Sequence, residues 1–182
     1  MQPVNTIASR YDATTILFHW LVALLVVTQW IGAQTIDLFP KGDLRVDARS
    51  VHIVCGATLG VLLVLRLFWR ATLGRQLPAV GNWLIRLLAK LVHWGLYLSV
   101  AAQVIVGLAL ASARGDSLFG LYTIPSFAPG KAVTDQIMGV HESFGWVIVA
   151  LVVVHALAAL IHQSVWKDGV LDRMRFSARQ RA

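Results

Sequence analysis

The sequence has few charged residues and almost no cysteine. Only 14% of its 182 residues are Asp, Glu, Lys or Arg, whereas about a quarter is usual in a soluble domain. Cys55 is the only cysteine and lies in an apolar run, which excludes an intramolecular disulfide and a cysteine-rich metal site. Hydrophobic residues make up 57% of the chain, and the mean hydropathy is +0.68. These properties predict a membrane protein with a single domain over residues 1–182.

Four apolar stretches are long enough to cross a bilayer, which takes roughly 20 residues. We expect transmembrane helices at about residues 15–35, 50–69, 91–111 and 136–165. The predicted fold class is an all-α membrane protein, a four-transmembrane-helix bundle. The longest connection, residues 112–131, is rich in glycine and proline, which suggests a functional lid.

Lysine and arginine are unequally divided between the two ends of the predicted bundle. Eleven fall on the side that carries both termini and five on the other side. Since loops rich in these residues face the cytoplasm, we expect cytoplasmic N- and C-termini. The net charge of +7 is then an orientation signal, so the expected partner is membrane lipid and not nucleic acid. The first apolar stretch is too long for a signal-peptide core and lacks a cleavage site, so we expect it to be retained.

Histidine is the residue type that indicates chemistry. Ionisable side chains are costly inside a membrane and are usually functional there. Any single histidine could equally lie at the interface, bonded to headgroups or backbone, but that explanation is poor for all six together. They all fall in or at the ends of the spans: His19, His52, His93, His141, His155 and His162.

The spacing of the histidines predicts two pairs. His141 and His155 are fourteen residues apart, so they lie within roughly 40° of one helix face and ~21 Å apart along it. Because the helices alternate in direction, His52 matches His141 in depth near the outer side, and His19 matches His155 near the inner side. Two histidines that face each other across a bundle suit haem iron, which accepts imidazole as an axial ligand.

A small residue follows each of these four histidines by one turn, where it would leave clearance for a flat macrocycle. Small residues are also common in membrane helices for packing alone. The four candidates for haem packing are Ala23, Gly56, Gly145 and Ala159.

Other cofactor chemistries have less support. Glu142 is the only acidic residue inside a predicted span, whereas zinc and di-iron sites cluster their ligands at one depth, often with carboxylates. The chain has no Gly-rich phosphate loop or nucleophile elbow. It also lacks the Cys-x-x-Cys-His attachment motif, which favours non-covalent haem b over haem c.

The chain resembles the bacterial cytochrome b561 family, and within it the small di-haem proteins described as superoxide oxidases. The resemblance covers essentially the whole chain and depends on the order and spacing of short motifs. These are FHWL at 18–21, VHIVCG at 51–56, HES at 141–143, His155, His162, WKDGVL at 166–171 and RM at 173–174.

This resemblance implies two haems b, with His19 and His155 on the inner iron and His52 and His141 on the outer iron. It implies an oxidoreductase of the bacterial inner membrane, with ubiquinone as the electron acceptor. In the superoxide-oxidising members, superoxide at the outer, periplasmic face is the implied donor, and protons come from the cytoplasmic side.

Two further sets of residues are candidates for the substrates. A quinone or proton site is predicted at the cytoplasmic end, because histidine can protonate a reduced quinone, although Trp and Lys there are equally typical of interfacial anchors. Cations on the outer side could steer a small anionic donor, although five aspartates balance them. The first set is His162, His93, Trp166 and Lys167, and the second is Arg45, Arg49, Arg114 and Lys131.

Two other functions stay open. The chain could be a cytochrome b subunit that relays electrons for a dehydrogenase or hydrogenase, and it would then copurify with a redox partner protein. It could instead be a haem-free small transporter or scaffold with protonatable histidines, and the purified protein would then be colourless.

Overall fold

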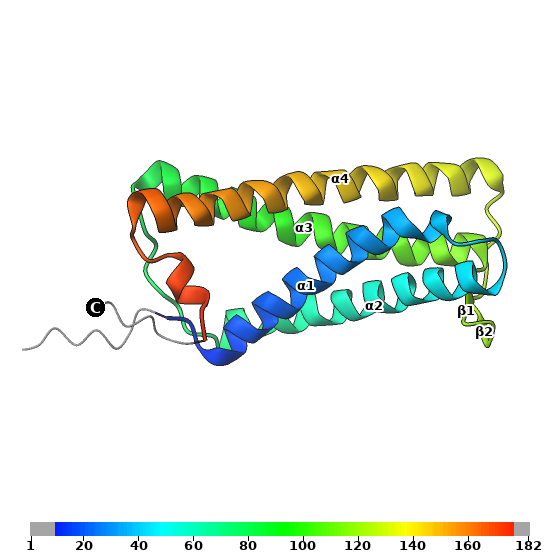
Figure 1. The fold of residues 1–182 in the computed structure, drawn as a ribbon, viewed down its shortest axis with the longest axis horizontal. Helices are drawn as coiled ribbons and strands as arrows, with labels where there is room; N and C mark the ends of the chain where they lie inside the picture. The colour runs from blue at the N-terminus through cyan, green and yellow to red at the C-terminus, as the bar shows by residue number, and fades with distance from the viewer. Residues whose placement is uncertain (1–9, 177–182) are drawn as a thin grey trace, which may run out of the picture.

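Four long helices make up most of the computed structural model, which describes residues 10–176 (Figure 1). Each helix is long and apolar enough to cross a membrane, which confirms the predicted four-helix membrane bundle. They are α1 (Ala13–Thr35), α2 (Asp43–Thr72), α3 (Trp83–Arg114) and α4 (Lys131–Ile161).

Several helices extend beyond the apolar runs because local capping sets their ends. The side chain of Asp12 accepts a hydrogen bond from Thr15 N (2.9 Å) and begins α1. Asn82 does the same through Ile85 N (3.0 Å), so α3 begins eight residues before the predicted start. Gly115 ends α3 in the left-handed region, with φ at 64°, a conformation that glycine adopts without strain.

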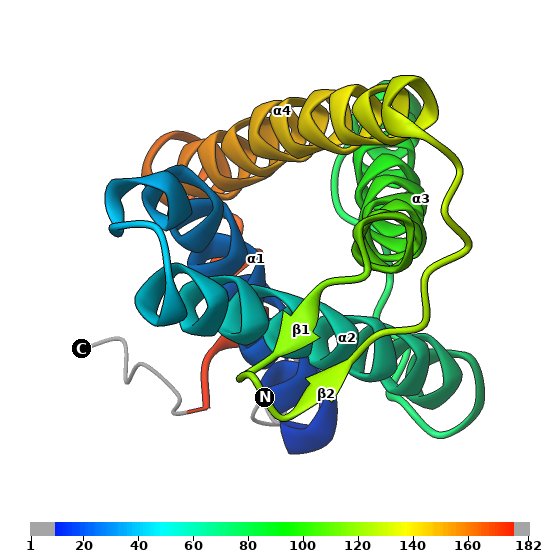
Figure 2. The same ribbon diagram turned by 90° about the vertical axis from the view of Figure 1, so that its right-hand side faces the viewer.

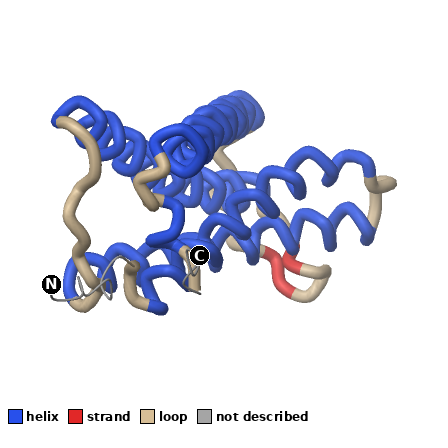
Figure 3. Tube along the Cα trace, turned by 60° about the vertical axis from the view of Figure 1, so that its left-hand side comes forward, coloured by secondary structure: helices blue, strands red, loops and turns tan. Residues whose placement is uncertain are grey.

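The connections carry short elements. A 3-10 turn, η1 (Ile36–Leu38), follows α1. The long connection after α3 contains an antiparallel hairpin of β1 (Ser117–Leu118) and β2 (Tyr122–Thr123), the small red element in Figure 3. A π-helical turn, η2 (His162–Trp166), and a 3-10 turn, η3 (Leu171–Met174), follow α4.

The connection predicted as a lid is fixed to the start of α2. The hydroxyl of Ser50, which is fully buried, accepts a hydrogen bond from Phe119 N (2.8 Å) and lies 3.1 Å from the carbonyl oxygen of Ser117. Arg49 forms an ion pair with Asp116 next to this contact (3.0 Å). The hairpin therefore covers one end of the bundle as a docked element.

The helices surround a common axis, as the end-on view shows (Figure 2). Pairs that follow each other in the chain pack together: α1 on α2, α2 on α3 and α3 on α4. An apolar layer at mid-depth holds the bundle together, and it consists of Val22, Leu59, Leu63, Val100 and Ile148. On α4, Ile148 lies seven residues from each of His141 and His155, so this apolar layer separates the two histidine pairs.

The first and last described residues meet at the end of the bundle opposite the hairpin (Figure 1). Tyr11 N donates a hydrogen bond to the carbonyl of Arg173 (3.1 Å), and Trp20 Nε1 donates to that of Met174 (2.8 Å). This end, called the terminal end below, is the one predicted to be cytoplasmic. Arg179 and Arg181, which contributed to that prediction, lie outside the described residues.

Candidate functional site

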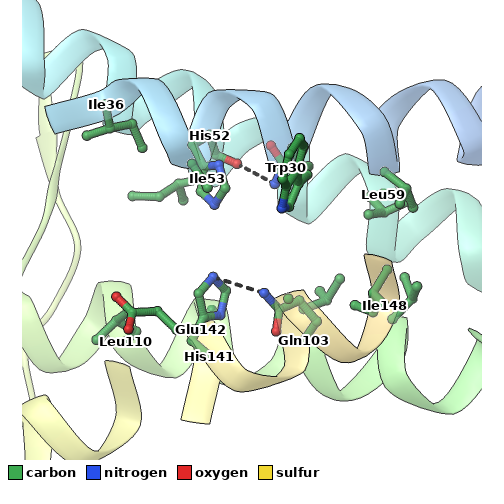
Figure 4. Close-up of a pocket in the computed structure, with 18 of the residues that line it drawn as sticks. Trp30, Ile36, His52, Ile53, Leu59, Gln103, Leu110, His141, Glu142 and Ile148 are labelled. Atoms are coloured by element: carbon green, nitrogen blue, oxygen red, sulfur yellow. Dashed lines mark hydrogen bonds between the residues drawn. The ribbon is translucent and has the colours of Figure 1, made fainter. Parts of the chain in front are cut away.

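The structure brings the two histidines of each predicted pair close together across the bundle. The ring centroids of His19 (α1) and His155 (α4) are 6.1 Å apart, and those of His52 (α2) and His141 (α4) are 6.3 Å apart. The planes cross at 71° and 78°. His52 and His141 point toward each other across a cavity (Figure 4).

These separations fit one metal ion between each pair. An imidazole–metal bond is about 2 Å long and the ring centre lies about 1 Å behind the ligating nitrogen, so two trans imidazoles stand roughly 6 Å apart. The Nδ1 atoms of His19, His52 and His141 are buried and have no hydrogen-bond partner among the described residues. Each of these three rings thus retains a free nitrogen, as a metal ligand requires. The donor set is a pair of imidazoles at each depth, which matches the axial set of a low-spin haem.

The outer pair lies in a cavity of about 740 Å³ that receives side chains from all four helices. This volume is within the range of roughly 300–1,000 Å³ that is usual for cofactor and ligand pockets. Its walls are mostly apolar, with Trp30, Leu59 and Ile148 toward the middle of the bundle (Figure 4). Arg49 and Arg114 line it at the hairpin end. The site therefore has room for a flat organic group between the two imidazoles.

Two glutamines that sequence reasoning missed support the outer histidines. Gln29 Nε2 donates to the carbonyl oxygen of His52 (2.9 Å), and Gln103 Nε2 lies 3.3 Å from Nε2 of His141. A Cβ on Gly56 would come within 2.7 Å of Gln29 Nε2, so Gly56 makes room for this contact. A Cβ on Gly107, also missed, would lie 2.9 Å from Cε1 of His141.

A repeat in the sequence could have revealed the glutamines. His19-Trp20 and His93-Trp94 are each followed by a glutamine ten residues after the histidine, in α1 and α3. The pattern Val-His-x-x-x-Gly then occurs at residues 51–56 in α2 and 140–145 in α4. The two helical hairpins thus place similar residues at similar depths.

The inner layer contains more than the predicted pair. His93, on α3, lies with its ring centroid 5.2 Å from that of His155, closer than His19 does. Arg66, on α2, has its guanidinium carbon 5.6 Å from the ring centre of Tyr97. The sequence groups His93 with His162 in a quinone or proton site. In the structure it lies beside the inner pair instead.

The predicted small residues differ in their surroundings. Ala23 and Ala159 are half-buried one turn beyond His19 and His155. A Cβ on Gly145 would be 3.7 Å from Gln103 Nε2, an ordinary contact. Gly56 differs from these residues, because the side chain of Gln29 already occupies the space that a Cβ would need.

The other residues predicted at the cytoplasmic end form a separate cluster in and just after η2. His162 Nδ1 lies 2.5 Å from Oδ2 of Asp168, and its ring meets that of Trp166 edge-on, with centroids 4.5 Å apart. Lys167 adopts a left-handed conformation (φ 52°) and turns the chain at this point. Asp168 was missed as a candidate, although it belongs to the WKDGVL motif.

Of the four outer cations, three have acidic partners. Arg45 pairs with Asp37 (3.5 Å), Arg49 with Asp116 (3.0 Å) and Lys131 with Asp135 (2.5 Å). The side chain of Arg114 forms no ion pair or hydrogen bond within residues 10–176 and lines the outer cavity. It is therefore the cation best placed to act on a molecule at the cavity mouth.

Comparisons with known proteins agree on one family. The sequence profile of the prokaryotic cytochrome b561 family matches residues 10–177. The chain is 30% identical over 169 residues to a Yersinia pestis protein named probable superoxide oxidase CybB, covering 91% of this chain and 95% of that protein. It is 29% identical to cytochrome b561 homolog 1 of Escherichia coli (strain K12), over 91% of this chain and 97% of the relative. It is 32% identical to homolog 2 of the same strain, over 91% and 90%.

The match extends over nearly the whole bundle and includes both histidine layers. Haem b is the cofactor that this family implies, and the paired imidazoles provide suitable ligands for it. The chain therefore belongs to the prokaryotic cytochrome b561 family, as a multi-pass electron-transfer protein of the bacterial inner membrane.

Proposed function

We propose that this protein is a di-haem b oxidoreductase that passes electrons from a donor at the outer face to ubiquinone in the membrane. One observation carries the proposal: two imidazole pairs, 6.1 and 6.3 Å between ring centroids, lie at two depths of one bundle. His19 and His155 would hold the inner haem, and His52 and His141 the outer haem. Bound there, each haem would take up and release single electrons, with no open iron position for oxygen.

His93 is not a ligand in this proposal, although it is close to His155. Its ring centroid is 5.2 Å from that of His155, which is shorter than the roughly 6 Å that two imidazoles on opposite sides of one metal ion require. His19, at 6.1 Å, meets that requirement.

Superoxide is the proposed donor. The support is the Yersinia pestis relative, whose name describes a probable superoxide oxidase, together with the unpaired Arg114 at the mouth of the outer cavity. Two superoxide anions would lose one electron each and leave as dioxygen. One quinone would take up the two electrons and two protons to become a quinol.

The proposed acceptor site is the cluster of His162, Trp166 and Asp168 at the terminal end. The carboxylate of Asp168 orients the His162 ring, with Nδ1 and Oδ2 2.5 Å apart, and the second ring nitrogen remains available for a proton. The positive-inside distribution of lysine and arginine supports a cytoplasmic location for this end. Protons would then be taken from the cytoplasmic side.

The alternative is a cytochrome b subunit that serves a dehydrogenase or hydrogenase. In that case the purified protein would carry the same haems but would reduce quinone only when its partner is present. Affinity purification under mild detergent, followed by an assay with superoxide alone, distinguishes the two.

The test of the haem proposal is an optical spectrum of the detergent-purified protein, oxidised and then reduced, with haem measured by pyridine haemochrome. We expect two low-spin haems b per chain. Alanine at His19, His52, His141 or His155 should remove one haem each, whereas His93→Ala should retain both. A colourless, correctly assembled protein would instead support a haem-free transporter or scaffold.

A further inference from the structure

Arg66 places a positive charge inside a membrane span. It lies six residues before Thr72, the last residue of α2, or about 9 Å inside the helix end. It is half-buried against the bundle interior. Charged side chains at such depths are rare, and they normally face the interior and have a partner there. We therefore expect Arg66 to have a partner inside the bundle.

No carboxylate among residues 10–176 fills that role. The sequence has no Asp or Glu between Asp47 and Asp116, which covers most of α2 and nearly all of α3. Within residues 10–176, Arg66 takes part in no ion pair. Its neighbour is Tyr97, whose side chain forms a hydrogen bond with it and whose ring centre lies 5.6 Å from its guanidinium carbon, so its neighbour within the bundle is a neutral phenol and not an anion.

A second cation lies on the same face. Arg70 follows Arg66 by one turn, and its guanidinium carbon is 5.4 Å from the ring centre of Tyr11. Arg70 likewise takes part in no ion pair within the described part of the chain. Two like charges four residues apart on a helix destabilise it unless an anion lies between or beside them.

The depth of Arg66 places it in the inner histidine layer. His19 is six residues after the start of α1, and His155 is six residues before the end of α4, as Arg66 is in α2. The Val-His-x-x-x-Gly repeat of α2 and α4 supports the same depth for Arg66. Arg66 follows His52 by fourteen residues, and His155 follows His141 by fourteen. Arg66 thus occupies in the first hairpin the position that an axial ligand occupies in the second.

We propose that Arg66, with Arg70 one turn nearer the terminal end, binds the carboxylate groups of the haem held by His19 and His155. This inference rests on the proposed function, since it requires a haem at that layer. Haem b carries two propionate carboxylates, and guanidinium binds a carboxylate through two parallel hydrogen bonds. A lipid phosphate is less suitable, because Arg66 is half-buried in the bundle at the depth of His19 and His155.

The first experiment is a redox titration of the purified holoprotein, followed by optical spectroscopy. Arg66→Gln should leave a propionate without its counter-charge, so an added electron on the inner haem becomes less favourable. We expect the oxidised-to-reduced ratio of that haem to rise about tenfold at a fixed potential, which is a fall of about 59 mV for a one-electron couple. Arg66→Lys, which keeps the charge, should shift it less.

Arg86→Gln provides the matched control. Arg86 is an exposed cation near the start of α3 at the same end of the bundle, and it has no ion pair in the described structure. This variant should change the ratio less than about threefold. If Arg66→Gln shifts the inner haem no more than Arg86→Gln does, the proposal is overturned.

A second experiment distinguishes carboxylate binding from a field effect through space. The full-length chain is produced without haem and loaded in detergent with either haem b or its dimethyl ester, which has no free carboxylates. Arg66→Gln should weaken binding of haem b to the inner site several-fold more than it weakens binding of the ester. Equal effects on both would overturn the carboxylate contact while leaving the haem proposal intact. Wild-type protein that binds no haem would overturn both proposals.

Discussion

The carboxylate of Asp12 accepts a hydrogen bond from the indole nitrogen of Trp69, 3.0 Å away, and so joins the start of α1 to the last turn of α2. The same carboxylate accepts hydrogen bonds from Thr15 N (2.9 Å) and Arg75 N (2.9 Å). Burial alone would raise the pKa of Asp12, but these hydrogen bonds outweigh it and hold the pKa well below its usual range. Asp12 therefore remains ionised in the folded protein.

Asp12→Ala should destabilise the bundle by about 1–2 kcal/mol at neutral pH, because it removes a helix cap and three further hydrogen bonds, from Thr15 Oγ1, Trp69 and Arg75. Since the pKa is lower in the folded than in the unfolded state, the carboxylate stabilises the fold above about pH 4, and this contribution decreases as the pH falls below that value. Thermal unfolding in detergent, followed by circular dichroism, measures the difference. Asp47→Asn, at an exposed site on α2, is the control and should have little effect at any pH.

Gly107→Ala should disturb the outer pair and leave the inner pair in place. The new Cβ would lie 2.9 Å from Cε1 of His141, so the imidazole must move. Under the proposed function, haem content falls from two toward one per chain, and the retained haem is the one lost in His19→Ala. Gly139→Ala, where a Cβ would meet nothing within 4 Å, should retain both haems. Full haem content in Gly107→Ala would contradict this account of the glycine.

Arg114→Gln should slow the reduction of the haems by superoxide about three- to tenfold at low ionic strength, because an unpaired cation at the cavity mouth attracts an anion. The dependence of the rate on salt should become shallower. Stopped-flow absorbance at several salt concentrations measures both quantities. Lys131→Gln removes an exposed cation that is already paired with Asp135, and it should change the rate much less. Equal effects of the two substitutions would count against steering by Arg114.

Asp168→Asn should lower the rate of quinone reduction by about tenfold or more, since proton transfer by an oriented histidine typically contributes that much. Haem content and spectrum should be unchanged, because Asp168 contacts His162 and neither residue belongs to the two histidine pairs. The rate of His162→Ala should be similar, and the double variant should be no slower than either single one. Ser164→Ala, in the same turn, is the control. If the two losses multiply in the double variant, His162 and Asp168 act independently and the prediction is contradicted.

The sequence predicts the four spans well because length and hydropathy alone decide them, and it predicts their ends less well. α3 begins at Trp83 and α2 at Asp43, since their first turns are polar or amphipathic and lie outside the apolar runs. These starts depend on capping and on the docked hairpin at Ser50. The Asn82 cap is local, whereas the hairpin that docks on Ser50 comes from a segment distant in the sequence.

The histidine pairing follows from depth, because rise per residue is nearly constant in a helix. The lateral neighbours depend on how each helix is rotated about its axis, which spacing along one helix does not determine. His93 thus lies beside His155 and not with His162. Gln29, Gln103 and Gly107 were missed for the same reason, although polar residues within apolar spans are themselves a signal.

The apolar layer of Val22, Leu59, Leu63, Val100 and Ile148 has an electrical consequence. These side chains offer no donor or acceptor along which a proton could hop, whereas an electron can tunnel through saturated hydrocarbon over short distances. Under the proposed function, an electron that passes between the two haems would cross this layer without a compensating proton. Each such transfer would be a current through the insulating part of the membrane, so its rate and equilibrium would respond to the membrane voltage.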